Sequence, residues 1–132
     1  MPQLTNLVLT DRKATPVAHT LVPVNIDKNG VAYVAESTGV PVADITLSIS
    51  TRRVNDKIKS RMVLTAPVVQ TEVINGISKP KAIRSAVAAV DFTFSRESTE
   101  GERNDVVGMI ADALGSAKVL VNDAIVKAQG IY

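Results

Sequence analysis

The chain has 132 residues, a formal net charge of +2 and no cysteine. This length suits one domain, residues 1–132, with a buried core. The lack of cysteine excludes a disulfide framework and a thiolate metal site. The first residues do not resemble a signal peptide, and no run of about 18 apolar residues could span a membrane. We therefore expect a soluble protein with no membrane partner.

The N-terminal part, residues 1–24, is predicted to form a β-hairpin. Two stretches with strand character, 4–10 and 17–24, are separated by a charged segment that ends in a proline. Pro23 has no amide hydrogen to donate, so it marks an edge or the end of the second strand. A further strand is expected from Val31 to Ala35, after an Asn-Gly pair.

The segment from Asp44 to Ala66 is predicted to be a β-hairpin with one basic face. Apolar and polar residues alternate on both sides of a turn at 54–56, with the period of two of half-buried strands. The two apolar sets must share a face, because a slip of one residue would expose them all. The opposite face then carries four cations and three hydroxyl groups: Arg52, Lys57, Lys59, Arg61, Thr46, Ser48 and Ser50. This face suits nucleic acid phosphates, although any solvated strand face also needs polar residues.

The sheet is expected to continue to residue 94. Residues 69–80, with the pair Asn75-Gly76, are predicted to be an exposed loop or a protruding hairpin. Residues 83–94 form the last predicted strand, and its two phenylalanines belong in the core. Alternation then places four residues on the side of the basic face: Ser85, Val87, Ala89 and Asp91.

Two helices are predicted within residues 99–129. Thr99 and Glu102 have the spacing of a capping box, Gly115 is placed to end the first helix, and Ser116 can cap the second. Strands followed by helices indicate the α+β class. Because only a short link separates the last strand from the helices, we infer that the helices of one chain cover the sheet of another in an intertwined homodimer.

No enzyme, metal site or cofactor is expected. His19 has no second histidine or cysteine to complete a metal site. The acidic residues Glu97, Glu100 and Glu102 fit a capped helix start better than a pair of catalytic carboxylates. A hydrolase that uses Glu97 or Glu102 stays as an alternative.

The order and spacing of several motifs resemble the coat proteins of single-stranded RNA bacteriophages, the leviviruses. The motifs are Asn29-Gly30-Val31-Ala32, Thr46-x-Ser48, Pro67 and Pro80 around Asn75-Gly76, Ser98-Thr99-x-x-Glu102-Arg103 and Gly130-Ile131-Tyr132. The resemblance implies an N-terminal hairpin, a five-stranded antiparallel sheet over residues 31–94, and two helices that clasp a partner subunit. It also implies that the 69–80 loop surrounds the symmetry axes of an icosahedral shell.

The same resemblance implies the function of a capsid protein. Dimers would enclose the single-stranded RNA genome in the virion, after assembly in the cytoplasm of the bacterial host. A dimer would also bind an RNA stem-loop at the replicase start, which represses replicase translation and marks the RNA for packaging. The alternatives are a dimeric RNA-binding repressor that does not assemble and a structural dimer without RNA.

The RNA contacts of the family fall on a defined set of positions in this chain. They are Val31, Thr46, Ser48, Ser50, Lys57, Lys59, Arg61, Val63, Val87, Ala89 and Asp91. The face derived from alternation adds Arg52 and Ser85. Where family members commonly have a base-stacking tyrosine and a polar partner, this chain has Val87 and Ala89, and Ser50 stands where an arginine is common. We therefore predict RNA binding with altered or weaker hairpin specificity.

Overall fold

The computed structural model describes residues 2–39 and 41–131, which divide into two compact units that meet between Thr93 and Phe94. Met1, Val40 and Tyr132, which belong to the domain expected for residues 1–132, lie outside the described residues. The first unit is built from an antiparallel sheet and the second contains two helices. No helix in the described residues is long and apolar enough to cross a membrane.

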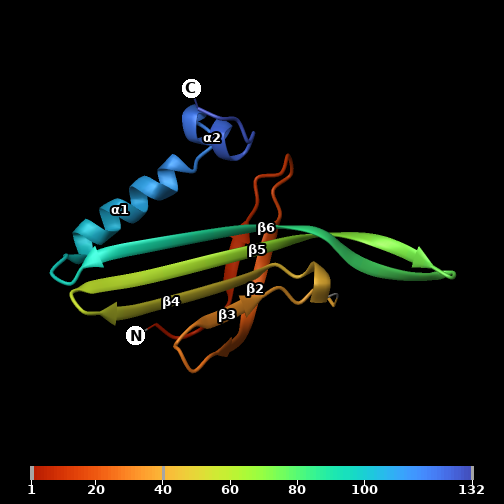
Figure 1. The fold of residues 1–132 in the computed structure, drawn as a ribbon, viewed down its shortest axis with the longest axis horizontal. Coiled ribbons are helices and arrows are strands. Elements are labelled where there is room, and N and C mark those ends of the chain that lie inside the picture. Colours follow the sequence, from red (N-terminus) through yellow and green to blue (C-terminus); the bar gives the residue numbers. More distant parts are fainter. Residues whose placement is uncertain (1, 40, 132) are drawn as a thin grey trace. The chain divides into compact units, whose positions relative to one another are not determined.

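The sheet has six antiparallel strands within the described residues, and their order in space follows the chain (Figure 1). The strands are β1 (Leu7–Thr10), β2 (Ala18–Ile26), β3 (Ala32–Ala35), β4 (Thr46–Val54), β5 (Lys57–Ile74) and β6 (Ile77–Ser95). A short 3-10 helix, η1 (Pro41–Ala43), precedes β4. Each strand pairs with its neighbour in sequence, so the sheet is a meander.

The antiparallel sheet and the two helices agree with the expected fold class, and the strand count differs slightly because the N-terminal hairpin is continuous with the sheet. Strand β2 does not end at Pro23: it pairs with β1 in its first half and with β3 in its second half. The register shifts between Pro23 and Asn25. Such an irregularity accommodates a residue that cannot donate to the ladder, so one strand can serve both neighbours.

Residues 69–80 form the end of a long hairpin of β5 and β6, which is the second of the two expected alternatives, a protruding hairpin. Strand β6 begins at Ile77 instead of residue 83. The predicted Asn-Gly turn is confirmed: Asn75 and Gly76 have φ angles of 52° and 78°, as a tight two-residue hairpin turn requires. The β-branched residues before this turn favour a strand. Figure 1 shows the end of this hairpin extending beyond β4.

The core of the first unit is small and lies on one face of the sheet. Leu21, Val34 and Leu47 are buried, and they come from β2, β3 and β4. Four partly buried residues pack against them: Leu4, Leu9, Ile45 and Leu64. Full burial of a leucine or valine side chain contributes about 1.5–3 kcal/mol, so the three buried residues fix which face of the sheet points inward.

The second unit contains α1 (Glu100–Ala113) and α2 (Val119–Ile125). The predicted capping box is confirmed: Thr99 Oγ1 accepts from the Glu102 amide at 3.2 Å, and Glu102 Oε2 accepts from the Thr99 amide at 3.3 Å. The cap expected at Ser116 is wrong, since α2 starts at Val119 and has no side-chain cap. Neither helix contains a buried residue, so the apolar side chains of both stay accessible.

Candidate nucleic-acid interface

The pairing of β4 with β5 brings the predicted cations onto one face of the sheet. Arg52 pairs with Lys59, Ser50 with Arg61 and Val54 with Lys57. Directly paired residues of antiparallel strands point to the same face, so these side chains share a surface with the hydroxyl groups of β4. We call this surface the basic face, defined by Thr46, Ser48, Ser50, Arg52, Lys57, Lys59 and Arg61.

The opposite face of the same two strands is apolar near the core. Leu47 pairs with Leu64 and Ile49 pairs with Met62. Leu47 is buried, whereas Ile49 is 46% exposed and Met62 is 36% exposed. The alternation read from the sequence therefore predicted correctly which residues of this hairpin share a face.

Strand β6 borders the basic face. Arg61 Nη1 lies 3.0 Å from Asp91 Oδ2, and both side chains are more than half exposed. Since alternate residues of a strand share a face, Ser85, Val87 and Ala89 belong to the same side as Asp91. All four are exposed. An exposed ion pair contributes little to stability, but here it offsets part of the positive charge of Arg61.

Two valines and one aromatic residue complete the basic face. Val63 pairs with Ser48, and Val31, just before β3, donates its amide hydrogen to Asp27 Oδ1 at 3.0 Å. Ser48 also pairs with Tyr33 of β3, so the tyrosine ring lies on this side of the sheet. Tyr33 was absent from the predicted site, although it lies two residues after Val31 and therefore on the same face.

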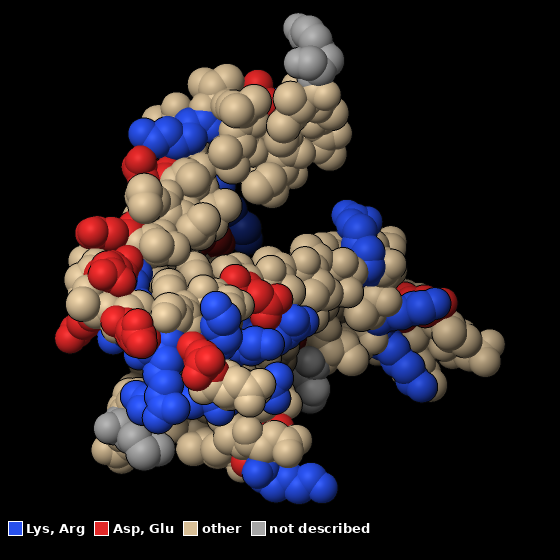
Figure 2. Space-filling model, turned by 60° about the vertical axis from the view of Figure 1, so that its left-hand side comes forward, with Lys and Arg blue, Asp and Glu red and all other residues tan. Residues whose placement is uncertain are grey.

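The surface near this hairpin is predominantly basic but not uniformly so. Figure 2 shows Lys and Arg side chains gathered, with some Asp and Glu side chains between them, on the side of the molecule that carries the turn between β4 and β5. Arg52, Lys57, Lys59 and Arg61 are all exposed. Four cations on one two-stranded surface, with one facing carboxylate, can hold several phosphate groups.

His19 is held between two carboxylates. His19 Nε2 lies 2.8 Å from Asp11 Oδ2, and His19 Nδ1 lies 3.1 Å from Glu36 Oε1. The hydrogen bonds to Asp11 and then to Glu36 raise the pKa of His19. The described residues contain no cluster that could hold a metal ion. The two hydrogen bonds of His19 connect β2 to the segments after β1 and β3.

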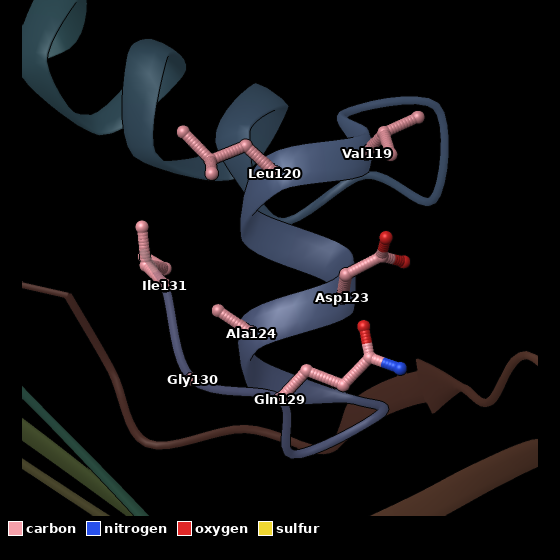
Figure 3. A pocket seen from close by; sticks show the side chains of 7 residues that line it. All are labelled: Val119, Leu120, Asp123, Ala124, Gln129, Gly130 and Ile131. Carbon is pink, nitrogen blue, oxygen red and sulfur yellow. The ribbon is translucent and has the colours of Figure 1, made fainter.

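An apolar hollow of about 360 Å³ lies between α2 and the C-terminal segment. Figure 3 shows Leu120, Ala124 and Ile131 on the same side of α2. Asp123 at its edge is 3.0 Å from the Lys127 ammonium. The lining residues bring no nucleophile next to a base, so the hollow has no catalytic chemistry of its own.

Comparison with known proteins shows the family of the chain. The family model for the levivirus coat protein matches residues 2–132. The capsid protein of Pseudomonas phage PRR1 is 50% identical over 131 residues, which cover 98% of this chain and 99% of that protein.

Solved structures give the same answer for the fold. The capsid protein of bacteriophage GA superposes with a TM-score of 0.82 at 26% identity, over 98% of each chain. An unassembled bacteriophage coat protein dimer, described as an RNA-binding dimer, superposes with a TM-score of 0.71 at 22% identity, over 98% of each chain. The chain therefore belongs to the levivirus coat proteins, and it is a structural capsid protein and not an enzyme.

Proposed function

We propose that this capsid protein forms a homodimer, that dimers assemble into an icosahedral shell around single-stranded RNA, and that the dimer also binds a genomic stem-loop. The register of β4 and β5 carries the proposal, because it places four exposed cations on one face. By binding the stem-loop at the replicase start, the dimer represses replicase translation and selects the RNA for packaging. Assembly takes place in the bacterial cytoplasm and the product is the virion.

The exposed apolar side chains of the helices support the dimer. Val107 and Ile110 of α1 are 45% and 42% exposed, and Leu120 of α2 is 67% exposed. The sheet carries its own exposed apolar residues, Ile49 and Met62, on the face opposite the cations. Each buried Å² of apolar surface contributes about 25 cal/mol, so helices of one subunit that clasp the partner subunit would remove both sets from water.

The proposed RNA-binding residues combine charge with hydroxyl groups. They are Val31, Thr46, Ser48, Ser50, Arg52, Lys57, Lys59, Arg61, Val63, Ser85, Val87, Ala89 and Asp91. The cations hold phosphates without reading sequence, and the serine and threonine hydroxyls can reach the 2′-hydroxyl groups of RNA. Val87 and Ala89 offer neither a ring nor a polar group, so we expect weaker discrimination between stem-loops.

Two neighbouring arginines give a matched test of the basic face. Arg52 pairs with Lys59 on the basic face, whereas Arg53 pairs with Ile58 on the opposite face. We expect Arg52→Ala to weaken RNA binding. The association constant should also fall less steeply with salt, with the slope of its logarithm against log salt smaller in magnitude by about 0.7–0.9. Arg53→Ala removes the same charge and should change neither quantity by a comparable amount. Equal effects of both variants would contradict a binding site on one face.

Assembly and specificity need separate measurements. Light scattering, absorbance at 260 and 280 nm and negative-stain microscopy, before and after nuclease, should detect uniform particles that contain RNA. An RNA-free dimer at all salt concentrations would overturn the shell and favour the repressor that does not assemble.

Affinity for the genomic stem-loop and for a scrambled one, at fixed salt, measures specificity. Tight binding with large discrimination would contradict the expected loss of specificity.

A further inference from the structure

We infer that Tyr33 is a stacking platform for an unpaired base of single-stranded RNA, an inference that rests on the proposed RNA-binding function of the basic face. The chain has no tryptophan, and its aromatic residues are two tyrosines and two phenylalanines. Phe92 and Phe94 are partly buried in β6. Among the described residues, Tyr33 is the aromatic side chain that the strand register places on the basic face.

The neighbours of Tyr33 leave its ring accessible. Tyr33 pairs with Asn25 on one side and with Ser48 on the other. On β4 the diagonal positions are Thr46 and Ser50, so the side chains on the β4 side of the ring are short and polar. The residue is 37% exposed. An aromatic ring on a sheet, bordered by short polar side chains, has the geometry on which single-stranded nucleic acid binding proteins stack bases.

A hydrogen bond fixes the ring at its outer end. Tyr33 Oη donates to Asp27 Oδ2 at 3.3 Å. Asp27 itself is fixed, because its Oδ1 accepts from the amides of Asn29 at 2.8 Å and Val31 at 3.0 Å. The ring is therefore attached to β3 at one end and to the turn between β2 and β3 at the other. A side chain held at both ends loses less conformational entropy when a base stacks on it.

The position of Tyr33 relative to the cations fits one RNA strand. Tyr33, Ser48 and Val63 lie side by side on β3, β4 and β5, and Arg61 is two residues farther along β5. With strands about 4.8 Å apart and about 3.4 Å per residue, Tyr33 and Arg61 are about 12 Å apart along the sheet. A short RNA can therefore hold a phosphate at Arg61 while one of its bases covers Tyr33.

The test uses the full-length protein and two decamers with identical phosphates, oligouridine and an abasic RNA. We expect Tyr33→Ala to weaken binding of oligouridine by about 5- to 150-fold, the effect of one stacked base, and to leave binding of the abasic decamer unchanged. Tyr33→Phe keeps the ring but loses the hydrogen bond to Asp27, so it should bind more weakly than the unchanged protein and more tightly than Tyr33→Ala. Tyr33→Leu keeps apolar bulk without the ring and should resemble Tyr33→Ala.

Salt dependence separates stacking from charge. Stacking releases no counterions, so Tyr33→Ala should leave the slope of log K against log salt unchanged. Lys59→Ala removes a cation and should make this slope smaller in magnitude by about 0.7. Equal binding of oligouridine by Tyr33→Ala and the unchanged protein, with weaker binding by Lys59→Ala, would overturn stacking and leave the basic face intact. If Lys59→Ala and Arg52→Ala bind as well as the unchanged protein, the basic face itself is wrong.

Discussion

The hydrogen bonds of His19 connect three segments of the N-terminal part of the chain. Asp11 follows β1, His19 lies in β2 and Glu36 follows β3. The backbone amide of Val17 and then the His19 ring lower the pKa of Asp11 to about 2, and Lys13 lies 3.8 Å from the same carboxylate. The His19 ring, held between two carboxylates, therefore attaches the N-terminal hairpin to the rest of the sheet.

We expect this cluster to make stability depend on pH. The pKa of His19 is raised above 6.5, so its contribution is complete below pH 6.5 and is lost as the pH rises through the folded-state pKa. The pKa of Asp11 falls from 3.8 to about 2, so its contribution is present above pH 3.8 and is lost as the pH falls through about 2. Urea unfolding at several pH values should show a loss of stability above pH 6.5 that His19→Gln removes. Parallel pH profiles of the two proteins would contradict this role.

At the scale of single elements, the cap of α1 is a local feature that can be tested by itself. Thr99 and Glu102 each accept a hydrogen bond from the amide of the other. Thr99→Ala removes one of these acceptors and should lower the free energy of unfolding by about 1 kcal/mol. Thr99→Ser keeps the hydroxyl and should lose less. The measurement is urea unfolding of the dimer, and equal stability of all three proteins would show that the cap does not support the folded state.

The elements that the sequence predicted well are those whose cause is local. The β4–β5 hairpin follows from alternation, the start of α1 from two residues three positions apart, and the turn at Asn75 and Gly76 from their tolerance of positive φ. What the sequence did not predict depends on distant partners. Strand β2 continues past Pro23 because β1 and β3 hold its two halves.

The same distinction applies to the candidate site. The cations and hydroxyls of the basic face could be predicted, since one register fixes them all. Tyr33 was missed because its strand has only four residues, too few for alternation alone to assign a face. The two partners of His19 could not be found from spacing, because Asp11 and Glu36 approach it only when β1, β2 and β3 have formed the sheet.

At the scale of the whole molecule, the described residues bury too few apolar side chains for a stable isolated chain. Leu21, Val34 and Leu47 are the buried hydrophobic residues, and neither helix adds one. A second copy that covers the exposed apolar side chains would supply the missing burial, so folding and association should occur together.

This coupling predicts a melting temperature that depends on protein concentration. Dissociation accompanies unfolding of an obligate dimer, so mass action raises the melting temperature as concentration increases. For dimers released from the shell, we expect the melting temperature to rise steadily as the protein concentration increases a hundredfold. Circular dichroism measures this temperature. Chemically cross-linked dimers serve as the control and should show no such dependence. A constant melting temperature for the untreated protein would mean that the single chain is stable alone.

The long hairpin of β5 and β6 has a consequence for how one sequence can fill unlike positions in a closed shell. Within the part of the chain that the structure describes, the two strands near Asn75 and Gly76 pair with each other alone, whereas β5 at its start also pairs with β4. The free energy of local opening should therefore decrease from the root of this arm to its end, as graded protection from hydrogen exchange would record. We therefore expect the end of this arm to bend more easily than its root, which would let identical subunits meet different neighbours at little cost to the sheet.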